Sequence, residues 1–295
     1  MGNEPGGPWY HEDLSRFRDA LTLAVAESGF SSRLIEKDYY CSLLLHDLSG
    51  PFEQGLVFKG GTCLSKVHAE FFRLSEDLDF SIHIRPDARR SERRGAASPI
   101  RDHFSGVPQR LAWFELAGLF EGHNDSRQYN GRFAYHSAVT GEREFIKVEV
   151  SLREENLLPP EIHPARTLLR DPYSGQSALP PVNVRVLQLR EAYAEKIRAA
   201  LTRREPAIRD FFDIDHAVQH ARFDFRDQAV LGLVVAKLSI AGNNSVDLSD
   251  EKVEILRGQV ETQLRPVLRT MDYEAFDLER VISGLQELVR LYQRS

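Results

Sequence analysis

The segment 73–82, "RLSEDLDFSI", alternates acidic and apolar residues with the period of a β-strand. Successive side chains of a strand point to opposite faces. Asp77 and Asp79 are therefore expected on one face of the strand, and the apolar residues between and after them on a buried face. Two carboxylates so close together repel each other unless a positive charge lies near both. A chain with this strand needs a core on one side and a cation on the other, for which a metal ion is the candidate.

A glycine pair precedes this strand. The sequence "GLVFKGG" predicts a short buried strand that enters a tight turn at Gly60 and Gly61, and "TCLSKVHAEFF" predicts a helix that begins at Thr62. Glycines allow the backbone to approach a ligand closely, and the N–H groups of a helix N-terminus favour an anion such as phosphate. Taken alone, the glycines are also consistent with a simple turn, and the aspartates with a solvated strand face. Together they have the two parts of a metal–nucleotide site, a phosphate cradle and oxygen ligands.

A third carboxylate is predicted on a neighbouring strand. The segments "GRFAYHSAV" and "EREFIKVEVSL" alternate and flank Thr140–Gly141, which predicts a β-hairpin. Glu149 lies on the polar side of the second strand. It either joins the two aspartates or forms a surface ion pair.

Two predicted helices downstream carry further charged residues. The sequence "EKIRAALTRREPAIRDFFDID" places Lys196 on one helix, and Asp210 and Asp213 one turn apart on a shared face of the next. A lysine in this position could reach a triphosphate as a point charge. The alternative is exposed ion pairing of the aspartates with neighbouring arginines, worth well under ~1 kcal/mol for each pair.

Composition restricts the class of protein. The chain has 295 residues, of which 42% are hydrophobic, with two cysteines and a net charge of −6. Two cysteines suit a reducing cytoplasm, and the N-terminus lacks the basic and apolar regions of a signal peptide. No apolar run reaches the ~18–20 residues of a membrane helix. The negative charge argues against indiscriminate nucleic-acid binding. A basic stretch is nevertheless present, formed by Arg85, Arg89, Arg90, Arg93, Arg94 and Arg101 in a segment expected to be a loop or the frayed start of a helix.

The expected organisation is a small mixed sheet framed by helices and followed by a helical C-terminal half. Residues 12–48 predict two helices, and the proline-rich residues 153–185 predict a linker across the surface. The predicted domains are therefore residues 1–185 and 186–295.

The order and spacing of five motifs resemble the AbiEii family. These motifs are "FKGGTCLSK", "RLSEDLDFSI", "IKVEVS", "REAYAEKIRAALTR" and "RDFFDID". Upstream, "LIEKDYYCSLLLHDL" is similar to the N-terminal helical segment of that family, so that the resemblance spans roughly residues 30–220. The family comprises nucleotidyltransferase-like toxins of type IV toxin–antitoxin and abortive-infection (phage-defence) systems, and it includes the mycobacterial MenT toxins.

The resemblance implies an α+β chain with a DNA polymerase β-like nucleotidyltransferase fold, whose helical C-terminal domain contributes to the site. By this resemblance Gly60, Gly61 and Thr62 form a nucleotide cradle, and Arg73 and Ser75 contact the triphosphate.

The same resemblance implies roles for the charged residues. Asp77 and Asp79 would bind Mg²⁺, or Mn²⁺ in its place, and Lys196 would contact the nucleotide phosphates. Asp210 matches the essential C-terminal aspartate of the family. Glu149 occupies the position of a base that activates the attacking hydroxyl.

The implied function is a toxin that transfers NMP from an NTP to RNA, with the 3′ acceptor end of tRNA as the implied acceptor and with two Mg²⁺ ions, and thereby blocks translation. The implied partners are the NTP, the RNA and an antitoxin encoded by an adjacent gene, in the cytoplasm and without a membrane. Two alternatives stay open: nucleotidyl transfer to a protein or small-molecule hydroxyl, and a GTP-binding partner module without turnover. A basic surface beside the site would favour RNA, whereas a closed acidic pocket would favour a small cationic acceptor.

Overall fold

The computed structural model of the chain describes residues 9–50, 55–220 and 222–293. The N-terminal segment in which no signal peptide is predicted therefore lies partly outside the described residues. The chain divides into two compact units, an N-terminal unit of residues 1–156 and 160–186 and a C-terminal unit of residues 157–159 and 187–295. Each unit is described by itself below. None of the helices in the described ranges has the length and apolar character to cross a membrane.

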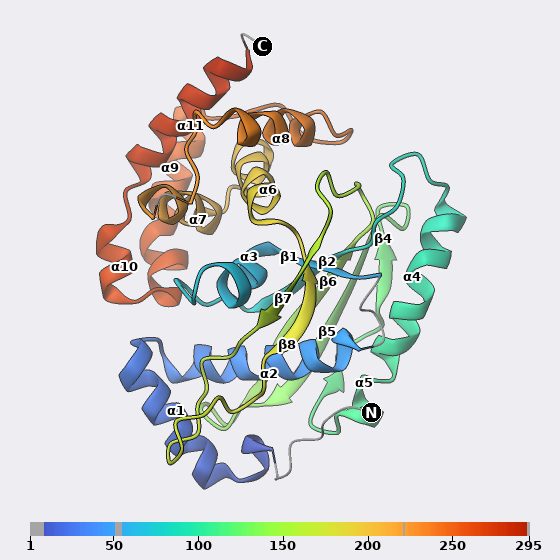
Figure 1. The fold of residues 1–295 in the computed structure, drawn as a ribbon, viewed down its shortest axis with the longest axis vertical. Helices are drawn as coiled ribbons and strands as arrows, with labels where there is room; N and C mark the ends of the chain where they lie inside the picture. Colours follow the sequence, from blue (N-terminus) through green and yellow to red (C-terminus); the bar gives the residue numbers. More distant parts are fainter. Residues whose placement is uncertain (1–8, 51–54, 221, 294–295) are drawn as a thin grey trace. The chain divides into compact units, whose positions relative to one another are not determined.

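The N-terminal unit is built on an eight-stranded mixed sheet (Figure 1). Its strands are β1 (Val57–Lys59), β2 (Asp77–Ser81), β3 (Glu115–Leu116), β4 (Glu121–His123), β5 (Gln128–His136), β6 (Arg143–Ser151), β7 (Glu161–Ala165) and β8 (Val182–Val186). The order across the sheet is β3-β5-β6-β2-β1-β8-β7, and β4 pairs with β5. The predicted acidic strand, β2, is thus an interior strand, antiparallel to β1 and parallel to β6.

The predicted hairpin is confirmed as the β5–β6 pair, in which Thr140 and Gly141 lie in the turn. Gly141 has a φ of 73°, a left-handed conformation that favours glycine. The antiparallel register runs without interruption from Gln128 opposite Ser151 to His136 opposite Arg143. This long ladder fixes which side chains of both strands share a face.

One face of the sheet is covered by helices of the N-terminal unit. These are α2 (Ser32–Ser49), α4 (Arg90–Ser105) and α5 (Val107–Arg110), while α1 (Leu14–Ser28) packs on α2 and the 3₁₀ turn η1 (Tyr10–Glu12) contacts α1. The ring of Tyr135 on β5 stacks on Tyr40 of α2 at a centroid distance of 3.9 Å, and Phe133 packs on Phe104 of α4 at 5.6 Å. The aromatic side chains of β5 therefore carry the contact between the sheet and both helices.

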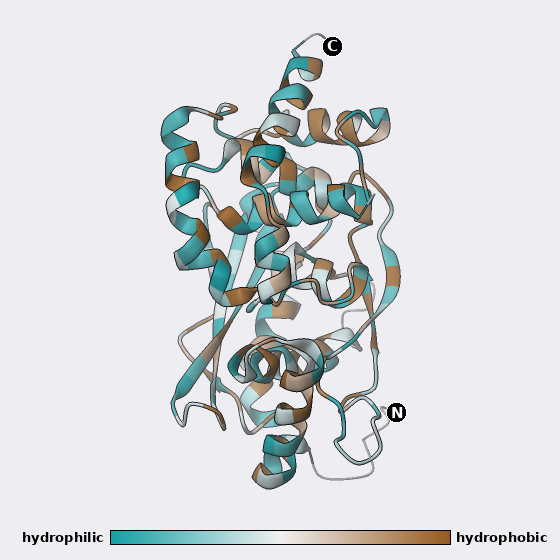
Figure 2. Cartoon of the chain, turned by 90° about the vertical axis from the view of Figure 1, so that its left-hand side faces the viewer, coloured by the Kyte–Doolittle hydropathy of each residue, from teal (hydrophilic) through white to brown (hydrophobic). Residues whose placement is uncertain are grey.

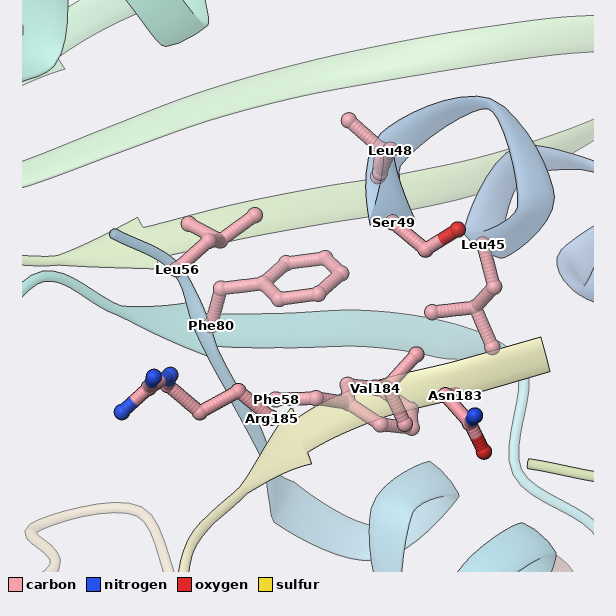
Figure 3. Close-up of a pocket in the computed structure, with 9 residues that line it drawn as sticks. All are labelled: Leu45, Leu48, Ser49, Leu56, Phe58, Phe80, Asn183, Val184 and Arg185. Carbon is pink, nitrogen blue, oxygen red and sulfur yellow. The ribbon is translucent and has the colours of Figure 1, made fainter. Parts of the chain in front are cut away.

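A small cavity remains between α2 and this covered face. Its volume is about 20 Å³, which is room for roughly one water molecule. In Figure 3, α2 contributes Leu45 and Leu48 to its wall, and the strands contribute Phe58, Phe80 and Val184. Ser49, Asn183 and Arg185 complete the wall with Leu56, so the lining is mostly apolar, and the small volume indicates a packing defect on the face opposite the two aspartates.

A buried ion pair anchors the helical segment that follows the glycine turn. This segment consists of α3 (Gly60–Cys63) and the π-helical turn η2 (Leu64–His68). The ammonium of Lys66 lies 2.5 Å from the carboxylate of Asp38 on α2, with both side chains almost fully buried. It also donates to Ser42 Oγ at 2.7 Å, and Asp38 accepts a further hydrogen bond of 2.8 Å from Thr167. The charges are thus compensated by a complete set of partners.

The two residues before Asp38 bind other elements of the same unit. Glu36 accepts hydrogen bonds from the Ser137 hydroxyl and from the backbone N–H of Ala138. Burial raises the pKa of Glu36, although these hydrogen bonds oppose the increase. Lys37 donates to Glu76, just before β2, at 2.9 Å. One turn of α2 therefore connects the hairpin, the acidic strand and the segment after the glycine turn.

Of the two alternatives for residues 85–101, the loop is wrong and the helix start is closer, because most of this segment lies in α4. The helix has a capping box in which the Glu92 side chain accepts from the Arg89 backbone N–H. Its buried residues, Arg93, Ala97, Ile100 and Phe104, recur at helical spacing. The many arginines concealed this stripe in the sequence, and Pro99 is tolerated inside the helix.

The linker predicted for residues 153–185 is also wrong, because this segment supplies β7 and part of β8. β8 pairs with β1 in parallel and with β7 antiparallel. Val182, Val184 and Val186 alternate as expected for a strand, and Pro164 is tolerated because β7 is at the edge of the sheet. The sheet is consequently larger than the sequence indicated.

The C-terminal unit is helical, as predicted. It contains α6 (Leu189–Thr202), α7 (Ile208–Gln219), α8 (Gln228–Leu238), α9 (Asp250–Gln259), the turns η3 (Val260–Leu264) and η4 (Arg265–Val267), α10 (Thr270–Ala275) and α11 (Leu278–Tyr292). Figure 2 shows hydrophobic and hydrophilic residues alternating around the helices near the C-terminus. The fold class, a mixed sheet framed by helices with a helical C-terminal part, is confirmed.

A buried ion pair also organises the C-terminal unit. Lys237 of α8 and Glu191 of α6 are both fully buried and lie 2.7 Å apart. Glu191 also accepts hydrogen bonds from the backbone N–H groups of Leu157 and Leu158, at 2.9 and 2.8 Å. These contacts explain why residues 157–159 belong to the helical unit although the sheet continues after them.

Candidate functional site

The glycine turn is packed so closely that neither glycine has room for a side chain. Gly60 has a φ of 73°, and a Cβ atom there would lie 2.3 Å from Oδ2 of Asp79. A Cβ at Gly61 would lie 2.2 Å from the Arg73 guanidinium and 3.2 Å from Ser75 Oγ. The structure thus brings together five of the residues singled out in the sequence, around the backbone of the turn.

A second turn returns the chain over the glycines. Glu70 and Phe71 have φ values of 52° and 58°, a left-handed conformation that is uncommon for residues other than glycine. The backbone N–H of Phe71 donates to the Ser65 carbonyl at 3.0 Å, which closes this turn. The reversal directs the buried side chain of Arg73 back toward Gly61. Thr62, the remaining predicted cradle residue, donates from its hydroxyl to the Asp77 carbonyl.

The two aspartates lie where the alternation predicts. Asp77 and Asp79 are partly buried, whereas Leu78 and Phe80 between and after them are buried in the core. In the parallel register with β6, Asp79 is opposite Glu149. The three carboxylates therefore belong to the same face of two adjacent strands.

A lysine accompanies these carboxylates. Lys147 is opposite Asp77 in the register, and its ammonium lies 2.9 Å from the Glu149 carboxylate. Partial burial is the largest single influence on the pKa of Lys147 and lowers it, whereas the hydrogen bond with Glu149 raises it. The negative charges of Glu149, Asp77 and Asp79 add to it, so that the pKa is raised overall. This lysine is a positive group near the acidic pair that the sequence reasoning did not identify.

The donor set of the acidic pair fits a hard cation such as Mg²⁺, because both side chains are carboxylates on one face of one strand. Within residues 9–50, 55–220 and 222–293, no three His, Cys, Asp or Glu side chains gather closely enough to hold a metal ion. Glu149 is engaged with Lys147 in this structure. Asp77 and Asp79 are therefore the residues that would hold the ion.

The C-terminal unit contains a separate group of charged residues. Lys196 of α6 lies 2.8 Å from Asp210 and 2.9 Å from Asp213, both on α7. The Lys196 side chain is 13% exposed, Asp210 4% and Asp213 0%. Arg203 reaches Asp210 from the surface at 3.0 Å. The alternative reading of this sequence, exposed surface ion pairs, describes only this last contact.

The structure gives Asp213 a role that sequence reasoning left unassigned. Its carboxylate is the most deeply buried of the group, and it holds the ammonium of Lys196 together with Asp210. The available signal was the spacing of the two aspartates, since residues three apart share a helix face. The partner on the other helix could not be inferred from that spacing.

The arginine-rich stretch is largely engaged in ion pairs. Arg93 is buried and bonds to Asp125 at 2.6 Å, and Arg90 approaches the same aspartate at 3.6 Å. Arg85 and Arg101 lie 3.6 and 3.5 Å from aspartates of their own segment. Four of these arginines are thus partly neutralised, which makes this stretch a weaker candidate for contact with a phosphate backbone.

The chain matches one family model, described as "Nucleotidyl transferase AbiEii toxin, Type IV TA system", over residues 43–282. The matched range includes the glycine turn, the acidic pair and the buried Lys196 group. No curated protein sequence gives a significant match.

Two crystal structures of proteins from Helicobacter pylori are similar at low identity. The first is of a candidate nucleotidyltransferase that is 17% identical, with 89% of this chain and 91% of that chain covered and a TM-score of 0.46. The second is of JHP933, which is 16% identical, with 97% of this chain and 94% of that chain covered and a TM-score of 0.46.

The close packing of Gly60 predicts that alanine destabilises the chain at this position but not at an unobstructed glycine elsewhere. The change Gly60→Ala should lower the free energy of unfolding by at least about 1–2 kcal/mol, because the left-handed backbone is unfavourable for alanine. The added Cβ must also displace the Asp79 carboxylate. Gly95→Ala in α4 is the matched control, since a Cβ there meets nothing within 4 Å. It should be neutral or stabilise the chain by about 0.5–1 kcal/mol in urea denaturation. Equal effects of the two changes would contradict this account of the turn.

The buried Lys196 group predicts a large cost for Asp213→Ala. Removing one partner of a buried ion pair leaves a poorly compensated charge, and a loss of about 3 kcal/mol in the free energy of unfolding is expected. Glu254→Ala, which removes an exposed partner of Arg257, should change stability by less than about 0.5 kcal/mol. Urea unfolding followed by circular dichroism measures both, and a small effect at Asp213 would show that the group is not the buried network described.

Proposed function

The chain belongs to the AbiEii family of nucleotidyl transferase toxins of type IV toxin–antitoxin systems, and on this basis we propose that it transfers a nucleoside monophosphate from an NTP to a hydroxyl of RNA. The proposed acceptor is the 3′ end of tRNA, whose modification would block translation. The observation that carries the proposal is the glycine turn, on which Asp79, Arg73 and Ser75 converge.

The proposed reaction breaks one bond of the triphosphate and forms one new ester. The acceptor hydroxyl oxygen attacks the α-phosphorus of the NTP, the bond between the α-phosphorus and the bridging oxygen breaks, and pyrophosphate leaves. Glu149, beside Asp79 in the register, is the proposed acceptor of the hydroxyl proton. Bound Mg²⁺ would neutralise negative charge on the triphosphate oxygens.

The residues of the turn have separate proposed roles. The small side-chain volume at Gly60 and Gly61 allows phosphate oxygens to approach backbone N–H groups. Arg73 supplies a positive charge next to Gly61, and Ser75 a hydroxyl donor. Asp77 and Asp79 would hold the ion. Together these residues would orient a triphosphate beside the two aspartates.

The proposal also includes the C-terminal unit. Lys196 is proposed to contact the nucleotide phosphates, with Asp210 and Asp213 fixing the position of its ammonium group. The family further implies a cognate antitoxin as a protein partner. We propose that the antitoxin is encoded by an adjacent gene.

The sharpest test incubates the purified chain with each α-phosphate-labelled NTP and total RNA, and identifies which nucleotide and which RNA become labelled. Asp77→Asn and Lys196→Ala should each reduce labelling at least about 100-fold, because each removes a charge that acts on the triphosphate in the transition state. Asp87→Asn, at a residue whose side chain is 77% exposed, is the matched control and should label at the wild-type rate. Wild-type labelling by the Asp77 variant would refute the site. Label on protein or on a small molecule would replace RNA as the acceptor, and nucleotide binding without any label would indicate a binding module.

The proposed metal dependence predicts that excess EDTA abolishes labelling and that Mg²⁺ or Mn²⁺ restores it. Asp77→Asn should also weaken binding of Mn²⁺ to the chain, measured directly by electron paramagnetic resonance without substrate, since it removes one of two charged oxygen ligands. Undiminished labelling in EDTA would refute a metal-dependent reaction.

A further inference from the structure

The β5–β6 hairpin has a second face, and none of the helices described for its own unit covers it. Its side chains alternate with the buried aromatic and aliphatic residues of the same strands. We call it the open face, and its exposed or partly exposed members are Gln128, Asn130, Arg132, His136, Arg143, Phe145, Lys147 and Glu149. It is polar and basic except for one aromatic ring.

Two arginines contact that ring, Phe145. The Arg132 guanidinium is 4.4 Å from the ring centroid, and the Arg143 guanidinium is 5.3 Å from it. Such cation–π contacts hold planar groups in fixed positions on the strand surface. The opposing residue on β5 is Ala134, which is too small to cover the ring from across the ladder. The cluster therefore presents flat groups and positive charge together.

The charge of this cluster is only partly neutralised. Arg143 bonds to Glu115 of β3 at 2.6 Å. Arg132 forms no ion pair with any residue that the structure describes, and its contact with Phe145 leaves its charge available. In a chain of net charge −6, a basic aromatic cluster of this kind favours a negatively charged ligand.

The open face is continuous with the acidic pair. Arg132 is opposite Lys147 in the β5–β6 register, and Lys147 is in turn opposite Asp77 on β2. From Arg143 to Glu149 the face extends over seven residues of one strand, which are six steps of ~3.3 Å, or about 20 Å. Stacked nucleotides repeat at about 3.4 Å along one strand. The face is therefore long enough for several nucleotides that end at the carboxylates.

We propose that the open face binds the single-stranded 3′ end of the acceptor RNA, with a base stacked on the Arg132–Phe145 cluster and a phosphate paired with Arg132. This inference rests on the proposed function, because it places the acceptor whose terminal hydroxyl reacts at the acidic pair. Unpaired bases stack on aromatic rings and on arginine planes, whereas the bases of a duplex are already paired and stacked. The side-chain amides of Asn130 and Gln128 are able to form hydrogen bonds with base edges beside the cluster.

Binding of a fluorescent single-stranded RNA of twelve nucleotides, measured by anisotropy without NTP on the full chain, tests the placement. Phe145→Leu keeps an apolar side chain but removes the stacking surface, and it should raise the Kd at least about 5-fold, because stacking contributes ~1–3 kcal/mol per base. Phe145→Tyr keeps the ring and should bind as the wild type does. Arg132→Gln should raise the Kd and reduce the slope of log K against log salt by about 0.7, the value for one phosphate contact on a single strand. Phe145→Leu should leave that slope unchanged.

Two controls exclude general effects of charge or aromatic loss. Arg101→Gln removes an exposed arginine of α4, and Tyr173→Leu removes an aromatic residue that is 80% exposed. Neither should change the Kd. In transfer assays, the open-face variants should raise the KM for RNA and leave the KM for NTP unchanged.

The outcomes separate this inference from the proposed function. If the wild type labels RNA but the open-face variants bind RNA as it does, the placement is wrong and the proposed function stands. Equal binding of duplex RNA would overturn the single-strand assignment. If the variants lose binding of a protein partner and keep that of RNA, the open face is a protein interface. If the wild type neither binds nor labels RNA, the proposed function fails with it.

Discussion

The ion pair between Lys66 and Asp38 is the contact on which the N-terminal unit depends. Desolvating both charges costs several kcal/mol, which good geometry and further hydrogen bonds must offset. The pair obtains these from Ser42 and Thr167. Because Lys66 lies on the helical segment after the glycine turn, the same pair holds that segment against α2.

The same strands of the sheet form the hydrophobic core on one side and carry the charged side chains on the other. Odd and even residues of β5 and β6 divide into a buried side, which packs on α2 and α4, and a polar side. The same division in β2 leaves Leu78 in the core and the aspartates outside it. Packing of the buried side chains therefore also fixes the positions of the charged side chains, since both are attached to the same backbone.

Local periodicity allowed the sequence to predict α1, α2, β2, the hairpin and the helical C-terminal half. It failed where composition obscured the period: arginines concealed α4, and prolines concealed β7 and β8. The aspartate pair could be recognised from its alternation alone. The approach of Arg73 and Ser75 to Gly61 could not, because it depends on the left-handed turn at Glu70 and Phe71. Lys147 was overlooked because its proximity to Asp77 depends on strand pairing, which no local pattern encodes.

The consecutive residues Glu36, Lys37 and Asp38 make α2 intolerant of insertion or deletion. Each residue of a helix is rotated about 100° from the one before, so these three side chains point in three directions. Each direction ends at a different element: the hairpin turn, the start of β2, and the segment after the glycine turn. Adding or removing one residue upstream in α2 would turn all three away together. The rotation of this helix about its axis therefore determines the contacts of three separate parts of the chain at once.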